Sequence, residues 1–197
     1  MSREYSMKDY FVFLAATAAI LVIGWTFMGN AAFLTATYTQ EGPLGTGYVF
    51  QEFFLQNYAY RLYIPDQGLY SDIFLYVDSD FLLNAGEAAW LWSVMFWDGF
   101  TYMGLGLALT FLLAVQMWYR YLDRTSRIPI RIRTILLIQL MNLLLPPLIF
   151  IGLYTTLSPE LNPSGYLVLD IFTYLLHFSA ALLLGIAFYY ELQQERD

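Results

Sequence analysis

The chain of 197 residues contains no cysteine and a single histidine, His177. The absence of cysteine excludes disulfides, iron–sulfur ligation and thiolate zinc sites within this chain. One histidine is too few for a bis-histidine haem or a multi-histidine copper or iron site built from this chain alone. We therefore predict no metal ligands in the chain, and we expect any metal centre that works with it to belong to a partner.

Charged residues are also scarce, and Lys8 is the only lysine. Soluble domains carry about 25% charged and about 45–50% apolar residues. This chain is 13% charged and 59% hydrophobic, with a mean hydropathy of +0.53. The net charge of −7 argues against nucleic acid as a partner, because phosphate binding needs clustered positive charge. The composition indicates an integral membrane protein.

Four apolar stretches are long enough to cross a hydrocarbon core, which needs about 20 helical residues. They cover about residues 10–34, 88–119, 134–156 and 166–190. We interpret the first stretch as a retained span, because it is too long for a signal peptide and no convincing cleavage site follows it. The sequence predicts an all-α, integral membrane four-helix bundle that forms a single transmembrane domain over residues 1–197.

The connection over residues 35–86 has a different character from the spans. Glycine and proline interrupt it at residues 42–47 and 65–68. Its two aromatic-rich segments, 48–63 and 69–81, are too short and too polar to cross a membrane. We expect short interfacial helices that form an outer cap. An interface for a partner subunit explains the aromatic residues equally well.

Basic residues are unevenly distributed along the chain. The loop over residues 120–133 holds five arginines and one aspartate, which is typical of a short cytoplasmic loop under the positive-inside rule. If both termini lie on that side, Arg61 is the only one of the nine basic residues outside. We therefore predict a multi-pass plasma-membrane protein with both termini in the cytoplasm.

A few polar side chains fall inside the predicted spans, where such groups usually face a protein interior. Asp98 lies about ten residues below the outer surface, and His177 lies about eleven or twelve below it. Gln139 and Asn142 share one face of the third span, about five to ten residues from its cytoplasmic end. We hypothesise a buried cluster of Asp98, His177, Asn142 and Gln139 towards the bilayer centre.

Three further polar residues are expected nearer the outer mouth of the bundle. Glu87 shares a helical face with Asp98, while Asp170 and Tyr174 share a stripe with His177. Such a cluster suits a quinone headgroup, whose carbonyls need donors and whose reduction needs protons, and it suits a proton path equally. Two other interpretations stay open: the polar groups satisfy one another for structural reasons only, or the bundle binds a pigment or a lipid.

The order of these parts resembles the DoxX/DoxD-like membrane protein family, which includes the small subunit of thiosulfate:quinone oxidoreductase. The local matches are a glycine–tyrosine pair and two short segments: Gly47 and Tyr48, IGWTFMGNAAF (23–33) and GLGLALTFLLA (104–114). The resemblance implies a place in a membrane-bound respiratory complex. Residues 14–21 lack the arginine of family members, and Asn30 stands near the position of their lysine, so no family site residue is transferred.

These features predict a membrane subunit of a multi-subunit respiratory or other electron-transfer complex, which contributes a quinone site or a proton path and is not catalytic alone. Its expected partners are other membrane subunits and lipid, and its only expected ligand is a quinone or a lipid. One alternative is a non-catalytic structural or assembly subunit that docks partners through the aromatic cap. Another is a small transporter, although four spans without internal repeats offer little to rock between two states.

Overall fold

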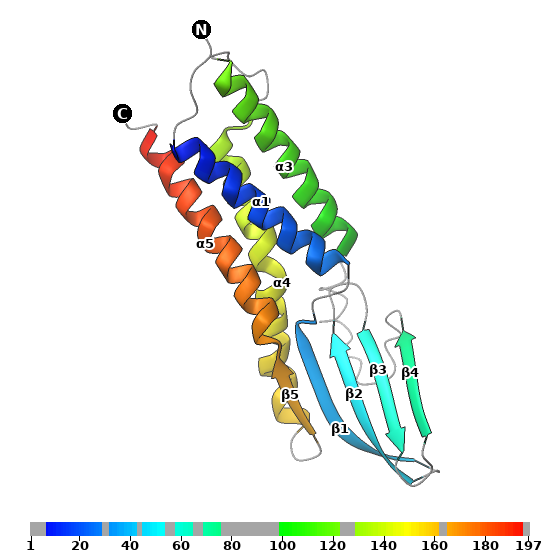
Figure 1. Ribbon diagram of the computed structural model, residues 1–197. Coiled ribbons are helices and arrows are strands. Elements are labelled where there is room, and N and C mark those ends of the chain that lie inside the picture. The colour runs from blue at the N-terminus through cyan, green and yellow to red at the C-terminus, as the bar shows by residue number, and fades with distance from the viewer. Residues whose placement is uncertain are drawn as a thin grey trace. The chain divides into compact units, whose positions relative to one another are not determined.

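The computed structural model describes residues 7–28, 32–42, 45–53, 58–64, 69–75, 99–122, 129–161 and 165–194. Four helices and five strands lie within these residues (Figure 1). The helices are α1 (Met7–Phe27), α3 (Gly99–Tyr121), α4 (Ile132–Leu161) and α5 (Ile171–Gln194). The strands are β1 (Leu34–Gly42), β2 (Gly45–Phe53), β3 (Tyr58–Ile64), β4 (Leu69–Leu75) and β5 (Gly165–Leu169).

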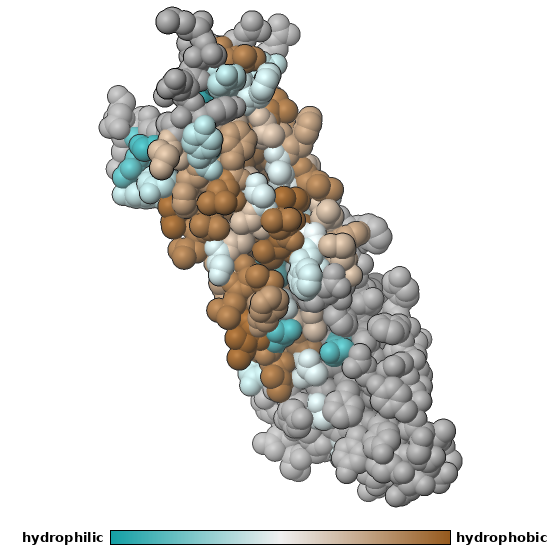
Figure 2. All heavy atoms as spheres, in the orientation of Figure 1, coloured by the Kyte–Doolittle hydropathy of each residue, from teal (hydrophilic) through white to brown (hydrophobic). Residues whose placement is uncertain are grey.

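All four helices are long and apolar enough to cross a membrane, with candidate spans at 7–27, 101–121, 132–152 and 171–193. Hydrophobic side chains gather over the surface of these helices in Figure 2. Phe111, for example, is 68% exposed. Such exposure is unfavourable in water and ordinary in lipid. The predicted transmembrane four-helix bundle is confirmed, and the chain is a multi-pass membrane protein.

Two predicted spans extended into residues that form strands. The first was predicted to reach residue 34, but α1 ends at Phe27 and β1 begins at Leu34. The fourth was predicted to begin at residue 166, but Gly165–Leu169 form β5 and α5 begins at Ile171. Hydropathy alone cannot separate a short apolar strand from the end of an apolar helix. Residues 88–98 of the second predicted span lie outside the described residues.

The described parts of the outer connection are strands, so the short interfacial helices predicted for residues 35–86 are wrong there. Strands β1, β2 and β3 each pair antiparallel with the next strand in the sequence, and the sheet order is β4-β3-β2-β1-β5. Tyrosine, phenylalanine and threonine are abundant in β1 to β3, and these residues favour strands. Only two residues separate Gly42 from Gly45, which is the commonest connection length of a β-hairpin.

The fifth strand comes from the other connection, between α4 and α5. It pairs antiparallel with β1 from Leu34↔Leu169 to Tyr38↔Gly165. Beyond the last pair, the Asp170 backbone N–H donates to the Phe33 carbonyl oxygen over 3.2 Å. Strand β1 therefore joins the two connections, which are far apart in the sequence, into one sheet.

The chain divides into two compact units. The bundle unit contains residues 1–25, 100–145 and 175–197, and the sheet unit contains residues 26–99 and 146–174. Within α4 the division falls at Pro146, the first residue of the Pro146–Pro147 pair, although α4 continues as a helix through both prolines. The sheet unit has an aromatic core, in which Phe33 stacks on Phe150 at 4.7 Å and meets the edge of Tyr174 at 6.0 Å.

The core of the bundle unit is made of aliphatic and small side chains from all four helices. Fully or nearly fully buried examples are Val12, Ala15, Ala19, Ile23, Leu113, Met117, Ile135, Leu136, Leu143, Leu184 and Ala187. A Cβ atom added to Gly106 would lie 2.8 Å from Ile23 Cδ1, so α3 and α1 approach closely at this point. This close approach places the backbone of α3 within reach of polar side chains on its neighbours.

Candidate functional site

Two titratable side chains meet in the interior of the bundle unit. The hydroxyl of Tyr102, in the first turn of α3, lies 3.3 Å from Nε2 of His177 on α5. Both side chains are buried. Depending on the imidazole tautomer, either the hydroxyl donates to Nε2 or the ring N–H donates to the hydroxyl oxygen. The contact therefore joins two groups that can exchange a proton.

Two amide side chains of α4 bind the backbone of α3 beside this pair. Asn142 Nδ2 donates to the Tyr102 carbonyl oxygen over 3.2 Å, and Gln139 Nε2 donates to the Gly106 carbonyl oxygen over 3.5 Å. A backbone carbonyl can only accept a hydrogen bond, so each amide must turn its nitrogen towards α3. The chemistry of the partner thus fixes the orientation of Asn142, and it favours the same orientation for Gln139, whose contact is longer.

The oxygen atoms of the same two amides are left without donors. Gln139 and Asn142 are 4% and 2% exposed, and no donor among the described residues reaches Gln139 Oε1 or Asn142 Oδ1. A buried acceptor without a hydrogen bond costs about 1–3 kcal/mol. The site therefore offers two acceptors, one helical turn apart on α4, to a group that can donate.

Gly106 explains how the amides reach the helix backbone. The position of its missing Cβ lies 3.6 Å from Asn142 Nδ2 as well as 2.8 Å from Ile23 Cδ1. A Cβ atom here would press against Ile23 of α1 and would be in ordinary van der Waals contact with the Asn142 amide. Gly104, two residues earlier in α3, has no atom within 4 Å of its Cβ position. Of these two glycines, only Gly106 is required by close packing.

Three of the four residues predicted for the buried cluster therefore bind the same stretch of α3. His177 meets the side chain of Tyr102, while Asn142 and Gln139 bind the carbonyl groups of Tyr102 and Gly106. We refer to these five residues as the Tyr102 cluster. The fourth predicted member, Asp98, lies outside the described residues, as does Glu87 of the predicted outer mouth.

The other two residues of the predicted mouth belong to the sheet unit. Asp170 precedes α5 as its N-cap, and its Oδ1 accepts hydrogen bonds from the backbone N–H groups of Phe172 at 2.9 Å and Thr173 at 3.3 Å. The sequence prediction placed Asp170 on one helical stripe with Tyr174 and His177, whereas in the structure Asp170 lies just before the first residue of α5. Tyr174 is buried and packs edge-on against Phe33.

Sequence reasoning missed Tyr102, although a signal was present. Tyr102 follows Asp98 by four residues, a spacing that places two side chains on one helical face. Asp98 is the ionisable group predicted in mid-span, and a phenol at this spacing can be its neighbour. A tyrosine that is fully buried in lipid-spanning helices needs a hydrogen-bond partner, and this requirement could have identified it.

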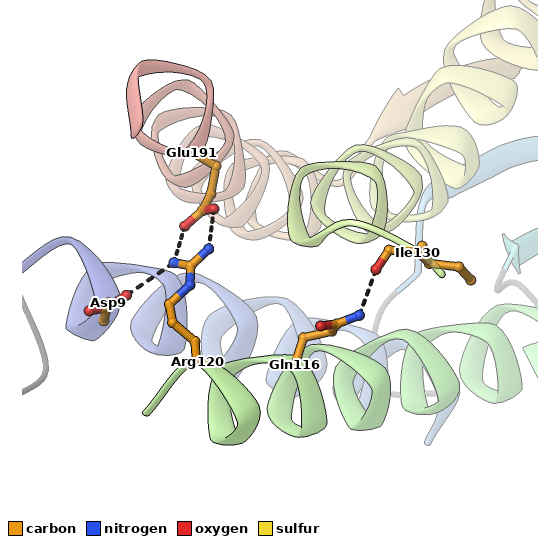
Figure 3. A network of polar contacts seen from close by, with 5 residues as sticks. All are labelled: Asp9, Gln116, Arg120, Ile130 and Glu191. Atoms are coloured by element: carbon orange, nitrogen blue, oxygen red, sulfur yellow. Dashed lines mark hydrogen bonds and ion pairs between the residues drawn. The ribbon is translucent and has the colours of Figure 1, made fainter. Parts of the chain in front are cut away.

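A second polar site, also missed, lies at the opposite ends of the helices. Arg120 of α3 binds Glu191 of α5 through two hydrogen bonds of 2.7 Å, and it binds Asp9 of α1 through one of 3.1 Å (Figure 3). The two carboxylate side chains are 5% and 7% exposed, against 23% for the arginine. The sequence assigned Arg120 to the cytoplasmic loop, whereas the structure makes it the centre of a three-helix ion cluster, here called the Arg120 triad.

One turn before Arg120, another side chain binds a loop backbone. Gln116 Nε2 donates to the Ile130 carbonyl oxygen over 2.6 Å (Figure 3). Gln116 is a buried amide like those of the Tyr102 cluster, but its Oε1 is not among the buried atoms without a partner. Gln116 is therefore a matched control for substitutions in the Tyr102 cluster.

The described part of the chain contains no group of three or more His, Asp or Glu side chains that could hold a metal ion. No model of a known protein family matches the chain, and no curated protein matches it.

Proposed function

We propose that this chain is a plasma-membrane subunit of an electron-transfer complex and that its Tyr102 cluster binds a quinone. The observation that carries the proposal is the pair of buried amide oxygens, Gln139 Oε1 and Asn142 Oδ1, next to the hydrogen bond between Tyr102 and His177. Buried polar atoms normally have partners, so a site that leaves two acceptors open is prepared for a ligand that donates.

The residues present fit a quinone headgroup by their chemistry. The two amide oxygens accept from hydroxyl groups, and each amide nitrogen keeps a second N–H beyond the one bound to α3. The Tyr102 hydroxyl and the His177 ring supply a donor or an acceptor according to the tautomer. A bound quinone would supply two-electron, two-proton redox chemistry.

The proposed work of the chain is to orient the headgroup, to exclude water and to hold a proton. Gln139 and Asn142 would fix the position of the ring oxygens, since their own orientation is fixed by α3. His177 and Tyr102 would hold or pass the proton at Nε2 and at the phenol oxygen. Electrons would come from partner subunits, because the chain has no cysteine and one histidine.

The distribution of basic residues supports an orientation for this site. Arg120 and the arginines that follow it favour the cytoplasmic side, and both termini would lie there too. The Tyr102 end of α3 would then face the outer leaflet, about 27 Å from Arg120 at 1.5 Å per residue. A proton released from the cluster would have a shorter path to the outside than to the cytoplasm.

Quinone content provides the direct test. The protein is extracted from its own membrane in mild detergent, and quinone per chain is measured after solvent extraction for the wild type and for the double variant Gln139→Leu with Asn142→Leu. We expect bound quinone in the wild type and at least about a tenfold loss in the double variant, because each amide contributes hydrogen bonds worth about 0.5–1.5 kcal/mol.

Gln116→Leu is the matched control, because it removes a buried amide outside the cluster. It should retain the wild-type quinone content. Absence of quinone from the wild type, or equal content in all three proteins, would contradict the proposed site. Native gel electrophoresis of the same extract tests the complex, since migration of the chain alone, without redox-active subunits, would contradict membership.

A second candidate function, a structural or assembly subunit, is favoured by the sheet. Among the described strands, β4 and β5 each pair on one side only. Unpaired strand edges are templates for an added strand from a partner. Cross-linking from a cysteine introduced into β4, for example at Ser71, would capture a neighbouring subunit if the edge is a docking surface, and capture nothing if it is not.

A further inference from the structure

We infer that the Tyr102 cluster binds the reduced, hydrogen-bond-donating form of its quinone more tightly than the oxidised form. This inference rests on the proposed function and goes beyond it by naming the redox state that the site prefers. It depends on which atoms of the two α4 amides remain open, and that is decided by their partners on α3.

The direction of the two α4 amides is set by their partners on α3. Gln139 and Asn142 each place the amide nitrogen on a carbonyl oxygen of α3, at Gly106 and Tyr102. Reversing either amide would bring two acceptor oxygens together and lose the hydrogen bond. Both amide oxygens must therefore point away from these carbonyls, and these are the atoms that lack a donor among the described residues.

The two redox forms of a quinone differ in the hydrogen bonds that they can make. An oxidised quinone presents two carbonyl oxygens, which only accept hydrogen bonds. Its reduced form presents two hydroxyl groups, which donate as well as accept. Only the reduced form can satisfy Gln139 Oε1 and Asn142 Oδ1, and the oxidised form would leave both oxygens buried without donors.

The other polar groups of the cluster do not discriminate between the oxidised and the reduced form. The hydrogen bond between the Tyr102 hydroxyl and His177 Nε2 forms with either imidazole tautomer, so it assigns no preference between the two redox forms. The second N–H of each amide assigns none either, because carbonyl and hydroxyl oxygens both accept hydrogen bonds. The preference between redox states thus falls on the two amide oxygens.

The size of the preference follows from the cost of an unmet buried acceptor. One hydrogen bond made only with the reduced form should give about a tenfold tighter complex. Because binding then stabilises the reduced form, the midpoint potential of the bound carrier should rise by about 30 mV for each tenfold ratio in a two-electron couple.

The test compares the two redox forms of one short-chain benzoquinone with the full-length protein in lipid nanodiscs, under anaerobic conditions. Binding is followed by quenching of the intrinsic tryptophan and tyrosine fluorescence. We expect the benzoquinol to bind wild-type protein at least about tenfold more tightly than the benzoquinone. The single variants Gln139→Leu and Asn142→Leu should each reduce that ratio, while Gln116→Leu should leave it unchanged.

Each outcome bears on a different claim. Equal affinity for the two forms in the wild type overturns this inference and leaves the quinone site standing, with water as the donor that satisfies the amide oxygens. Binding of neither form overturns the proposed function itself. If the leucine variants fail to fold, a redox titration of the carrier bound to wild-type protein decides the matter, because a midpoint at or below that of the free carrier contradicts the inference.

Discussion

The bundle unit contains two buried polar sites, and they differ in how the buried polar groups are paired. In the Arg120 triad every charged group meets an opposite charge, and the arginine ties α1, α3 and α5 together. The Tyr102 cluster is defined by hydrogen bonds rather than ion pairs, and no donor among the described residues reaches two of its amide oxygens. A fully paired site serves stability, whereas a site with open acceptors retains the capacity to bind.

The difference also has an energetic side. Removing one partner of a buried ion pair costs about 3–5 kcal/mol, because the other charge stays buried without compensation. A neutral buried hydrogen bond contributes only about 0.5–1.5 kcal/mol. Substitutions at the Arg120 triad should therefore reduce stability most, and substitutions at the Tyr102 cluster should change ligand binding more than stability.

The largest effect is expected for Arg120→Met. It leaves the buried carboxylates of Asp9 and Glu191 facing each other without a cation, so we expect a loss of about 3–5 kcal/mol in the free energy of unfolding. Thermal unfolding in detergent, followed by size-exclusion chromatography of the remaining folded protein, measures it. Arg120→Lys keeps the charge and should lose less. If Arg120→Met melted at the same temperature as the wild type, this result would contradict a structural role of the triad.

The two carboxylates of the triad should differ. Glu191 accepts two hydrogen bonds of 2.7 Å from Arg120, and Asp9 accepts one of 3.1 Å. Glu191→Gln should therefore cost about 1.5–3 kcal/mol. Asp9→Asn should cost less, because the remaining Arg120–Glu191 pair is electrically neutral. The same melting experiment ranks them, and the reverse order would show that the bidentate contact is not the stronger one.

The packing that supports the Tyr102 cluster can be tested through two glycines. Gly106→Ala places a Cβ 2.8 Å from Ile23 Cδ1 and should cost about 1–3 kcal/mol of stability. Gly104→Ala meets no atom within 4 Å and should be neutral or stabilising, as alanine favours helices. Ile23→Val removes the clashing methyl group, so it should partly rescue Gly106→Ala. Equal effects of the two glycine substitutions would contradict the close approach.

The smallest effect on stability is expected for Tyr102→Phe. It removes the hydroxyl that meets His177 and should cost about 0.5–1.5 kcal/mol. Tyr189→Phe is the control and should have a smaller effect, because it removes only an exposed hydrogen bond of 2.8 Å from Gln193 Nε2. Combined with Arg120→Lys, Tyr102→Phe should add to within about 0.5 kcal/mol, since the two residues lie about 27 Å apart along α3 at 1.5 Å per residue. Strong non-additivity would mean that the two sites are coupled.

The helices could be predicted from the sequence because their apolar runs are long, but the strands could not. The apolar residues of Gly165–Leu169 predicted the beginning of a helix, because leucine and valine are compatible with an apolar helix as well as with a strand. One signal was available at the boundary. Asp170 is a favoured N-cap residue, and an acidic residue just before an apolar run indicates that a helix begins there.

The two polar sites were predictable to different degrees. Gln139 and Asn142 were found because their spacing along one helix already places them on one face. The Arg120 triad joins residues near the two ends of the chain to one in its middle, and no local spacing relates Asp9 to Glu191. Such pairs depend on how helices associate in three dimensions. The resemblance of the chain to the DoxX/DoxD-like family and its role in an electron-transfer complex remain predictions.

Strand β1 also has a consequence for how the protein is made. Its partner β2 follows it immediately, whereas β5 is synthesised only after α3 and α4. One edge of β1 therefore remains unpaired while two membrane helices are translated. Unpaired strand edges are prone to pair with other chains. We expect the nascent chain to need protection of that edge until the ribosome has delivered β5, so that assembly of the sheet is a late checkpoint in biogenesis.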